Sequence, residues 1–209
     1  MKTAIRGAVL SDLPYLYDIC LKTGADGADA TNFFSDPWLI GQYYAAPYLV
    51  YNSCFCFVLE ENHIPTGYIV GTDDTTRFNQ WFEKVWLPPL RRRYPDESHK
   101  AQKTTSISPR EAQMISQLHH PISTKKLEDC PWIAEYPAHL HIDLLAEMQG
   151  KGFGRTLIDT FMEQLSQAGC TGSHLGVSAK NSGAISFYKK VGFTILHEDK
   201  HGKTMGKKC

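Results

Sequence analysis

The chain contains three glycines within five residues, Gly150, Gly152 and Gly154, at a point where its hydrophobic periodicity changes. Residues 138–145 before them alternate between apolar and polar, which predicts a strand, whereas residues 153–165 carry apolar side chains at helical spacing. Backbone N–H groups at the start of a helix have no partner within the helix, and glycines allow an anion to approach them closely. The sequence therefore predicts an α/β fold with an anion-binding turn between a strand and a helix.

Two common phosphate-binding motifs do not fit the spacing of this turn. A dinucleotide fingerprint starting at Gly152 would need glycine at position 157, which is leucine. A Walker A loop starting at Gly150 would need Gly-Lys at positions 155 and 156, which are Arg155 and Thr156. Lys151 and Arg155 add positive charge to the turn. On this motif alone, a glycine-rich turn without a ligand remains an alternative.

A second motif follows the predicted helix, from Asn181 to Phe193. Read in order, Gln-x-x-Gly-x-Gly and Asn-x-x-Ala-x-x-Phe-Tyr-x-x-x-Gly-Phe resemble the signature of the GNAT acetyltransferase superfamily, from about Leu140 to Phe193. The resemblance implies a mixed, mostly antiparallel central sheet of about six or seven strands flanked by helices. It also implies that acetyl-CoA is the co-substrate and that an amine, in a small molecule or a protein, is the acceptor.

The N-terminal half resembles the acetyltransferase-like domain at the C-terminus of O-GlcNAcases. Animal members of that group are thought to have lost the cofactor loop, whereas Gln149, Gly152 and Gly154 are present here, which favours a stand-alone protein that still binds acetyl-CoA. The alternative is a non-catalytic acetyl-CoA-binding or protein-interaction module, a pseudo-acetyltransferase. The segments that carry the resemblance are Tyr17–Cys20, Gly24–Thr31, Asp36–Gly41, Ala46–Leu49 and Cys56–Glu60.

The resemblance implies a set of contacts to CoA. Main-chain groups at the end of the strand would pair with pantetheine, the glycine-rich turn would hold the pyrophosphate, and Asn181 would contact the CoA arm. The residues expected to bind the cofactor are Leu144, Leu145, Ala146, Gln149, Gly150, Lys151, Gly152, Phe153, Gly154, Arg155, Asn181 and Tyr188.

Tyr188 falls at the tyrosine of the superfamily pattern, which implies that it protonates the departing CoA thiolate. A phenol with a pKa near 10 is a weaker acid than a free thiol near 8.5, so it stays protonated at neutral pH and can donate as charge develops on sulfur. The alternative is a helix tyrosine that packs beside Phe187.

The strand before the turn has one apolar and one polar face, because side chains along a strand alternate sides. His139, His141 and Asp143 share the polar face, which we expect to border the acceptor cleft. Asp143 is the first candidate for the general base, with His141 and then His139 as second choices. A structural polar network is the alternative. A metal triad is disfavoured because neighbours two apart on a flat strand converge poorly on one ion.

Further along the polypeptide, Asp26 and Asp29 lie in a turn-rich segment before a second helix expected from Asp36. In the superfamily this connection lines the acceptor pocket, so both aspartates and His139 are candidate substrate-binding residues. Ordinary Asx turns are the alternative for each aspartate.

The region from residue 75 to residue 132 is too long for a plain connection between strands. Hairpin strands are expected at residues 54–60 and 67–73, before this region, and a further strand at residues 4–9. The region itself contains two helical patterns, at residues 75–87 and 108–118. We therefore expect a large helical insertion before the fourth strand that covers the acceptor site.

Composition agrees with a single domain over residues 1–209, because 42% hydrophobic content can form one sizeable core. The charges balance, with 22 basic and 22 acidic side chains, so a nucleic-acid partner is not expected. Arg91, Arg92 and Arg93 are interpreted as a solvated helix end, with DNA binding as the alternative. No apolar run approaches the roughly 20 residues needed to span a bilayer, and the N-terminus lacks the apolar core of a signal peptide. These features predict a cytoplasmic protein without a membrane partner.

Overall fold

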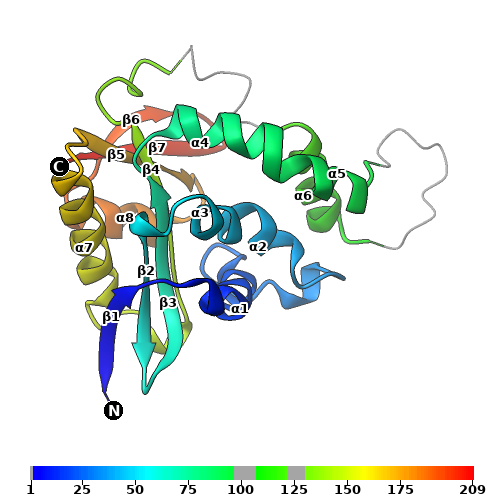
Figure 1. Ribbon diagram of the computed structural model, residues 1–209, viewed down its shortest axis with the longest axis horizontal. Coiled ribbons are helices and arrows are strands. Elements are labelled where there is room, and N and C mark those ends of the chain that lie inside the picture. Colours follow the sequence, from blue (N-terminus) through cyan, green and yellow to red (C-terminus); the bar gives the residue numbers. More distant parts are fainter. Residues whose placement is uncertain (1, 97–106, 122–129) are drawn as a thin grey trace.

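A seven-stranded sheet in the order β1-β2-β3-β4-β5-β7-β6 forms the centre of the protein (Figure 1). The computed structural model describes residues 2–96, 107–121 and 130–209. Every pair of neighbouring strands is antiparallel except β4 and β5. The expected mixed sheet of six or seven strands is confirmed. The strands are β1 (Thr3–Gly7), β2 (Cys56–Glu61), β3 (Ile64–Thr72), β4 (Ala138–Leu144), β5 (Gly172–Ser178), β6 (Thr194–Glu198) and β7 (Gly202–Lys208).

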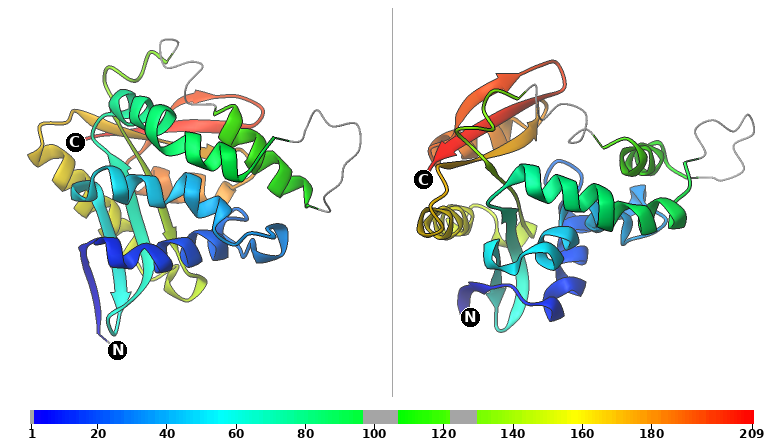
Figure 2. Two further views of the ribbon diagram at one scale, coloured as in Figure 1. Left: turned by 45° about the vertical axis from the view of Figure 1, so that its right-hand side comes forward. Right: turned by 45° about the horizontal axis from the view of Figure 1, so that its top comes forward.

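Helices cover both faces of the strands β1 to β4 (Figures 1 and 2). On β3, Tyr68 and Val70 pack into one apolar core with the N-terminal helices, whereas Ile69 between them packs into a second core with α7. A strand that is buried on both faces carries consecutive apolar residues, as β3 does at Tyr68, Ile69 and Val70. The helices are α1 (Leu13–Thr23), α2 (Leu39–Tyr44) and α3 (Ala46–Tyr51) on one face, α7 (Phe153–Gln167) on the other, and α8 (Ser182–Lys190) beside β5.

The strands β4 and β5 diverge from each other along most of their length. They pair only at Ala138 with Ser173 and at His139 with His174, whereas β4 pairs with β3 from His139 to Leu144. Beyond His139, the edge of β4 that faces β5 therefore has no partner strand among the described residues. This opening in the middle of the sheet is where the candidate site lies.

The predicted helical insertion before β4 is confirmed in its described part. Its first helix starts at Thr75 as expected but continues past residue 87, because a π-helical segment links two α-helices without a break. Ser108 caps the other predicted helix, and its hydroxyl accepts the Glu111 backbone N–H at 3.1 Å. The elements are α4 (Thr75–Trp81), η4 (Phe82–Trp86), α5 (Leu87–Arg93) and α6 (Pro109–His119).

Polar contacts fix the insertion to the loop before α2. The buried Glu111 carboxylate accepts hydrogen bonds from the Ser35 backbone N–H at 3.0 Å and from the Ser35 hydroxyl at 2.6 Å. Arg91 donates to both carboxylate oxygens of Glu83, at 2.6 and 2.8 Å. The arginine run ends α5 as expected; Arg92 and Arg93 are exposed, whereas Arg91 contributes to the fold through Glu83.

Two predicted boundaries were wrong. The second helix begins at Leu39 and not at Asp36, because the Asp36 carboxylate accepts the Trp38 backbone N–H at 2.9 Å in an Asx turn. The β2–β3 turn is only two residues long, since Asn62 and His63 adopt positive φ angles of 51° and 70°. Consequently β3 begins three residues before the expected position. Short 3₁₀ turns occupy η1 (Leu10–Asp12), η2 (Thr31–Phe33), η3 (Ser53–Phe55) and η6 (Ala146–Met148).

Asp12 joins the first strand to the first helix, and its replacement is expected to destabilise the fold. Its buried carboxylate accepts two hydrogen bonds from Arg6, at 2.7 and 2.9 Å, and one from the Val9 backbone N–H at 2.9 Å. The bonds to Arg6 hold the pKa of Asp12 below its usual value. We expect Asp12→Asn to lower the free energy of unfolding by about 1–3 kcal/mol, since Arg6 is partly exposed. Urea unfolding at pH 7 measures this loss.

Asp18→Asn is the matched control for this change. Asp18 also accepts from a cation, Lys22 at 2.8 Å, but both side chains are about half exposed. Exposed pairs at this helical spacing contribute about 0.3–0.5 kcal/mol. Equal losses in the two variants would contradict a special role for Asp12.

Candidate active site

A cavity of about 1040 Å³ lies where β4 and β5 diverge. Four parts of the chain line it: the end of α1 with the loop that follows, β4, the glycine-rich turn before α7, and β5 with α8. These parts are distant in sequence, and the central sheet brings them together. The cavity therefore extends from the glycine-rich turn to the polar face of β4.

The glycine-rich turn has the backbone geometry that an anion site needs. Gly150 and Gly152 adopt φ angles of 72° and 88°, a region that side chains disfavour, and an added Cβ at either would meet no atom within 4 Å. The Gln149 side chain donates to the Leu144 carbonyl at 2.8 Å and so fixes the turn to β4. The start of α7 borders the cavity, since Gly152, Gly154 and Arg155 all line it, and the first N–H groups of a helix are the ones that bind anions.

The two cations of the turn have different surroundings. Arg155 lines the cavity and donates to the carbonyl of Lys190, at the end of α8, at 2.7 Å. Lys151 is exposed and does not line the cavity. Arg155 is thus the predicted cation that the fold brings to the cavity, where it also ties α7 to α8.

Asn181 links α8 to the loop after α1 across the cavity. Its side-chain oxygen accepts the Ala184 backbone N–H at 2.9 Å, which caps α8, and its amide nitrogen donates to the Asp26 carbonyl at 3.2 Å. Asp26 has a φ angle of 56°, and both residues line the cavity. Asp29 does not line it, because its carboxylate accepts the backbone N–H and hydroxyl of Thr31, at 2.8 and 2.6 Å, in an Asx turn.

Tyr188 lies on α8 and lines the cavity from the β5 side. Its ring packs against those of Phe187 and Phe193, with centroids 5.4 and 5.7 Å away. None of the described residues forms a hydrogen bond with its hydroxyl. Burial raises the pKa of Tyr188, and the charge of Asp143 adds to the effect. The phenol is therefore protonated at neutral pH and free to donate into the cavity.

Asp143 lines the same cavity from β4. It lies opposite Tyr68 of β3 in register, and the Tyr68 hydroxyl donates to its carboxylate at 2.5 Å. Burial raises the pKa of Asp143, while hydrogen bonds from Tyr68 and Thr23 act in the opposite direction. A carboxylate with a raised pKa is a stronger base than an ordinary aspartate.

Two histidines share this face of β4, but only one of them reaches the cavity. His141 lines it, whereas His139 lies behind and contacts Tyr48 and Thr75. The Tyr48 hydroxyl lies 2.8 Å from His139 Nε2 and 3.1 Å from His141 Nε2. Burial lowers the pKa of His141 to about 4 and that of His139 well below its usual value, so both rings are neutral at pH 7.

The fold brings most of the predicted site residues to one place. Those that line the cavity are Asp26, His141, Asp143, Leu144, Gln149, Gly150, Gly152, Gly154, Arg155, Asn181 and Tyr188. Those that do not are Asp29, His139, Leu145, Ala146, Lys151 and Phe153. The Leu145 backbone N–H donates to the Thr66 carbonyl at 3.0 Å, so this group is already committed within the sheet.

The sequence patterns did not identify three tyrosines of the site. Tyr44 lines the cavity, Tyr48 joins the two histidines, and Tyr68 binds Asp143. Of the three, only Tyr68 could have been found from the sequence, because pairing of the two predicted strands in the right register places it opposite Asp143. None of the described insertion residues lines the cavity, so a cover over the acceptor site stays a prediction.

Neither a metal centre nor a membrane-spanning helix is found in residues 2–96, 107–121 and 130–209. No group of three or more histidine, cysteine, aspartate or glutamate side chains in these ranges could hold a metal ion. No helix in the same ranges is both long and apolar enough to cross a bilayer.

The sequence matches a family profile and two curated relatives. The profile of the Acetyltransferase (GNAT) family matches residues 120–193, which include β4, α7, β5 and α8. Protein O-GlcNAcase of Rattus norvegicus is 26% identical over 190 residues, which cover 90% of this chain and 20% of the rat protein. The protein of the same name from Mus musculus matches to the same extent. The chain thus spans about a fifth of the length of these relatives.

Solved structures resemble the chain along its whole length. The structure named SsHAT is 32% identical, with 100% of this chain and 98% of that one covered and a TM-score of 0.86. The PaiA N-acetyltransferase from Thermoplasma acidophilum, solved in complex with coenzyme A, is 16% identical with a TM-score of 0.58 and full coverage of both chains. The second likeness shows a shared fold.

Proposed function

Because the chain belongs to the Acetyltransferase (GNAT) family, we propose that it moves the acetyl group of acetyl-CoA directly to an amine in a ternary complex. The single observation that carries this proposal is the cavity between β4 and β5. The cavity is lined by the glycine-rich turn, by the carboxylate-bearing Asp143 and by Tyr188. These are the parts that an acetyl transfer between two bound molecules requires.

The cavity fits a thioester with a phosphorylated arm. Backbone N–H groups near Gly150 and Gly152 would hold the pyrophosphate, with Arg155 beside them and Asn181 against the arm. The edge of β4 beyond His139 offers main-chain groups to the pantetheine and to the thioester carbonyl. When bound, acetyl-CoA supplies the activated acetyl group.

The side chains of the cavity supply the proton transfers. Transfer to an amine requires that the ammonium lose a proton and that the departing thiolate gain one. Asp143 would take the proton, and its raised pKa supports this role. Tyr188 would donate to sulfur, and its free hydroxyl supports that role. Asp26, which lines the cavity, would contact the acceptor.

The first test is binding of acetyl-CoA. At a concentration about 100 times Kd, a ligand stabilises the folded state by about 2.7 kcal/mol, which corresponds to a rise in Tm of about 5–10 °C for a domain of this size. We expect Gly152→Ala to weaken binding about tenfold and so to halve this rise, because its Cβ would occupy the space beside the turn. Thermal unfolding with and without acetyl-CoA measures both values.

Gly169→Ala is the matched control for this variant. Gly169 also has a positive φ angle, 77°, and free space around a Cβ, but it lies at the end of α7 outside the cavity. Both variants should lose about 1–2 kcal/mol of stability from backbone strain. Only Gly152→Ala should lose part of the acetyl-CoA shift. If acetyl-CoA fails to raise the Tm of the wild type, the binding proposal is wrong.

A turnover assay separates the enzyme from the non-catalytic alternative. Release of the CoA thiol is followed with spermidine, glucosamine, a lysine-containing peptide and a peptide with a free N-terminus. Release that depends on one of these amines supports acetyl transfer. A Tm shift without release for any amine would instead favour a binding module.

A further inference from the structure

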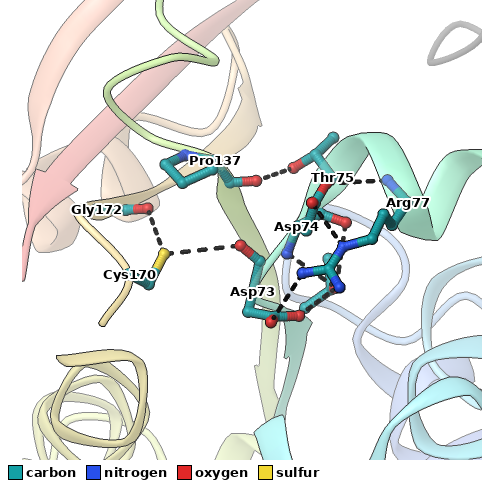
Figure 3. A network of polar contacts seen from close by, with 8 residues as sticks. Asp73, Asp74, Thr75, Arg77, Pro137, Cys170 and Gly172 are labelled. Atoms are coloured by element: carbon teal, nitrogen blue, oxygen red, sulfur yellow. Dashed lines mark hydrogen bonds and ion pairs between the residues drawn. The ribbon is translucent and has the colours of Figure 1, made fainter. Parts of the chain in front are cut away.

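A chain of hydrogen bonds runs from the start of α4 to the cavity, and its direction can be assigned from one end. The Thr75 hydroxyl lies 2.6 Å from the Pro137 carbonyl oxygen (Figure 3). A carbonyl oxygen can only accept, so the proton between these two oxygens belongs to Thr75. The hydroxyl of Thr75 is therefore used as a donor in this contact.

The remaining protons of the chain follow in sequence. His139 Nδ1 lies 2.8 Å from the Thr75 oxygen and must donate to it. Since burial keeps His139 neutral, its Nε2 is an acceptor, and the Tyr48 hydroxyl at 2.8 Å donates to that nitrogen. Tyr48 has no second proton, so His141 Nε2, at 3.1 Å, must donate to the Tyr48 oxygen.

This chain fixes the tautomer of His141. With its proton on Nε2, the neutral ring has a bare lone pair on Nδ1. His141 lines the cavity, whereas Tyr48 and His139 do not, and no described residue forms a hydrogen bond with Nδ1. Nδ1 is thus a hydrogen-bond acceptor without a partner among the described residues, on a ring that lines the cavity.

The spacing of His141 and Asp143 decides what could lie between them. Residues two apart on one face of a strand are about 6.6–6.8 Å from each other. Metal bonds of about 2.0–2.2 Å would span at most about 4.4 Å between ligand atoms. Two hydrogen bonds of about 2.9 Å span up to about 5.8 Å, which is much closer to the spacing of the two residues. A hydrogen-bonded nitrogen fits this gap better than a metal ion.

We propose that the acceptor nitrogen is held between the Asp143 carboxylate and Nδ1 of His141. This inference rests on the proposed acetyl transfer and deepens it, because it names the two groups that position the nucleophile. Two acceptors facing one atom require two N–H donors, which an ammonium group has and an alcohol or a thiol lacks. The site is therefore built for amines, with His141 orienting the nucleophile and Tyr48, His139 and Thr75 as positioning residues.

The proton and bond changes are balanced in this arrangement. One N–H proton of the ammonium passes to Asp143, and a second N–H stays bonded to His141 Nδ1. The freed lone pair of nitrogen attacks the thioester carbon, so a C–N bond forms and the C–S bond breaks. The proton of Tyr188 goes to the departing sulfur, and the third N–H proton, which the nitrogen loses as the amide forms, restores the phenol of Tyr188.

His141→Gln tests the role of Nδ1. The glutamine amide can still donate to Tyr48, but it lacks an acceptor at the Nδ1 position. We expect kcat/KM for the fastest amine of the panel to fall about 10–100-fold, while the acetyl-CoA shift in Tm is unchanged. Tyr48→Phe keeps the stacking of its ring on Phe78 but no longer fixes the proton of His141 on Nε2. We expect kcat/KM to fall about tenfold in this variant.

Tyr51→Phe is the matched control. Tyr51 also lies on α3 and contacts Phe78, and it does not line the cavity. It should retain wild-type kcat/KM. Wild-type kcat/KM in His141→Gln would overturn the inference.

A spectroscopic measurement tests the tautomer without any turnover. In protein labelled with ¹⁵N-histidine, long-range ¹H–¹⁵N correlations distinguish Nε2–H from Nδ1–H rings, and the spectrum of His141→Gln assigns the signal. We expect Nε2–H in the wild type and a mixture in Tyr48→Phe. A wild-type Nδ1–H ring would overturn the inference whatever the enzyme does. Acetyl-CoA binding without amine turnover would instead overturn the proposed function.

Discussion

Replacement of Tyr188 by phenylalanine is expected to lower kcat about 10²- to 10⁴-fold, the usual loss when a general acid is removed. The phenyl ring keeps its contacts with Phe187 and Phe193, so the fold and the shape of the cavity should be retained. What is lost is the proton for the departing thiolate. Steady-state kinetics of CoA release measures kcat, and the acetyl-CoA shift in Tm should remain close to that of the wild type.

Two further variants make this result specific. Asp143→Asn removes the proposed base and should lower kcat by a similar factor. Tyr15→Phe makes the same chemical change as Tyr188→Phe on an exposed tyrosine outside the cavity and should have no effect. Full turnover in Tyr188→Phe would remove the acid role, and full turnover in Asp143→Asn would remove the base role.

Mild acid is expected to destabilise the protein through its buried histidines. In an unfolded chain these rings titrate near pH 6.5, whereas burial lowers the pKa of His141 to about 4 and lowers those of His139 and His174 as well. Their contribution to stability is therefore complete above about pH 6.5 and is lost as pH falls toward about 4. At about 1.4 kcal/mol per unit over the roughly 1.5 units below pH 6.5, we expect a loss of about 2 kcal/mol between pH 7 and pH 5 for each ring that must stay neutral.

Urea unfolding at the two pH values measures this loss. Asp143 acts in the opposite direction, since its raised pKa makes protonation favour the folded state and offsets part of the effect. His141→Gln should reduce the dependence on pH, whereas His201→Gln, on the exposed β6–β7 turn, should leave it unchanged. An unfolding free energy that is flat from pH 7 to pH 5 would show that the histidines are not held neutral.

The sequence was most informative where a single periodicity determined a single element. Alternation along residues 138–144 correctly separated the core face of β4, with Ala138 and Leu140, from the face that carries Asp143. Asn181, which opens the second motif, caps α8, because its side-chain oxygen accepts the Ala184 backbone N–H. These are local effects, which depend on neighbours within a few residues.

The remaining parts of the site depend on contacts between distant segments. Tyr48 meets His139 and His141 across more than ninety positions of sequence, and nothing near Tyr48 indicates a polar partner. Asp29 looked like a pocket residue by position, but its carboxylate is used within its own turn. Hydrogen-bond partners of this kind become visible only once the register of β3 against β4 and the packing of α3 are known.

The parting of β4 from β5 also bears on solubility. An unpaired strand edge normally invites strands of other molecules and promotes aggregation, and proteins usually protect such edges at the rim of a sheet. Here the bare edge lies inside the sheet, flanked by β5 and α8 on one side and by the loop after α1 on the other. The main-chain groups of this edge are therefore reached through the cavity and not from the rim of the sheet. The fold can therefore leave main-chain groups open to a slender ligand without offering them to a second protein.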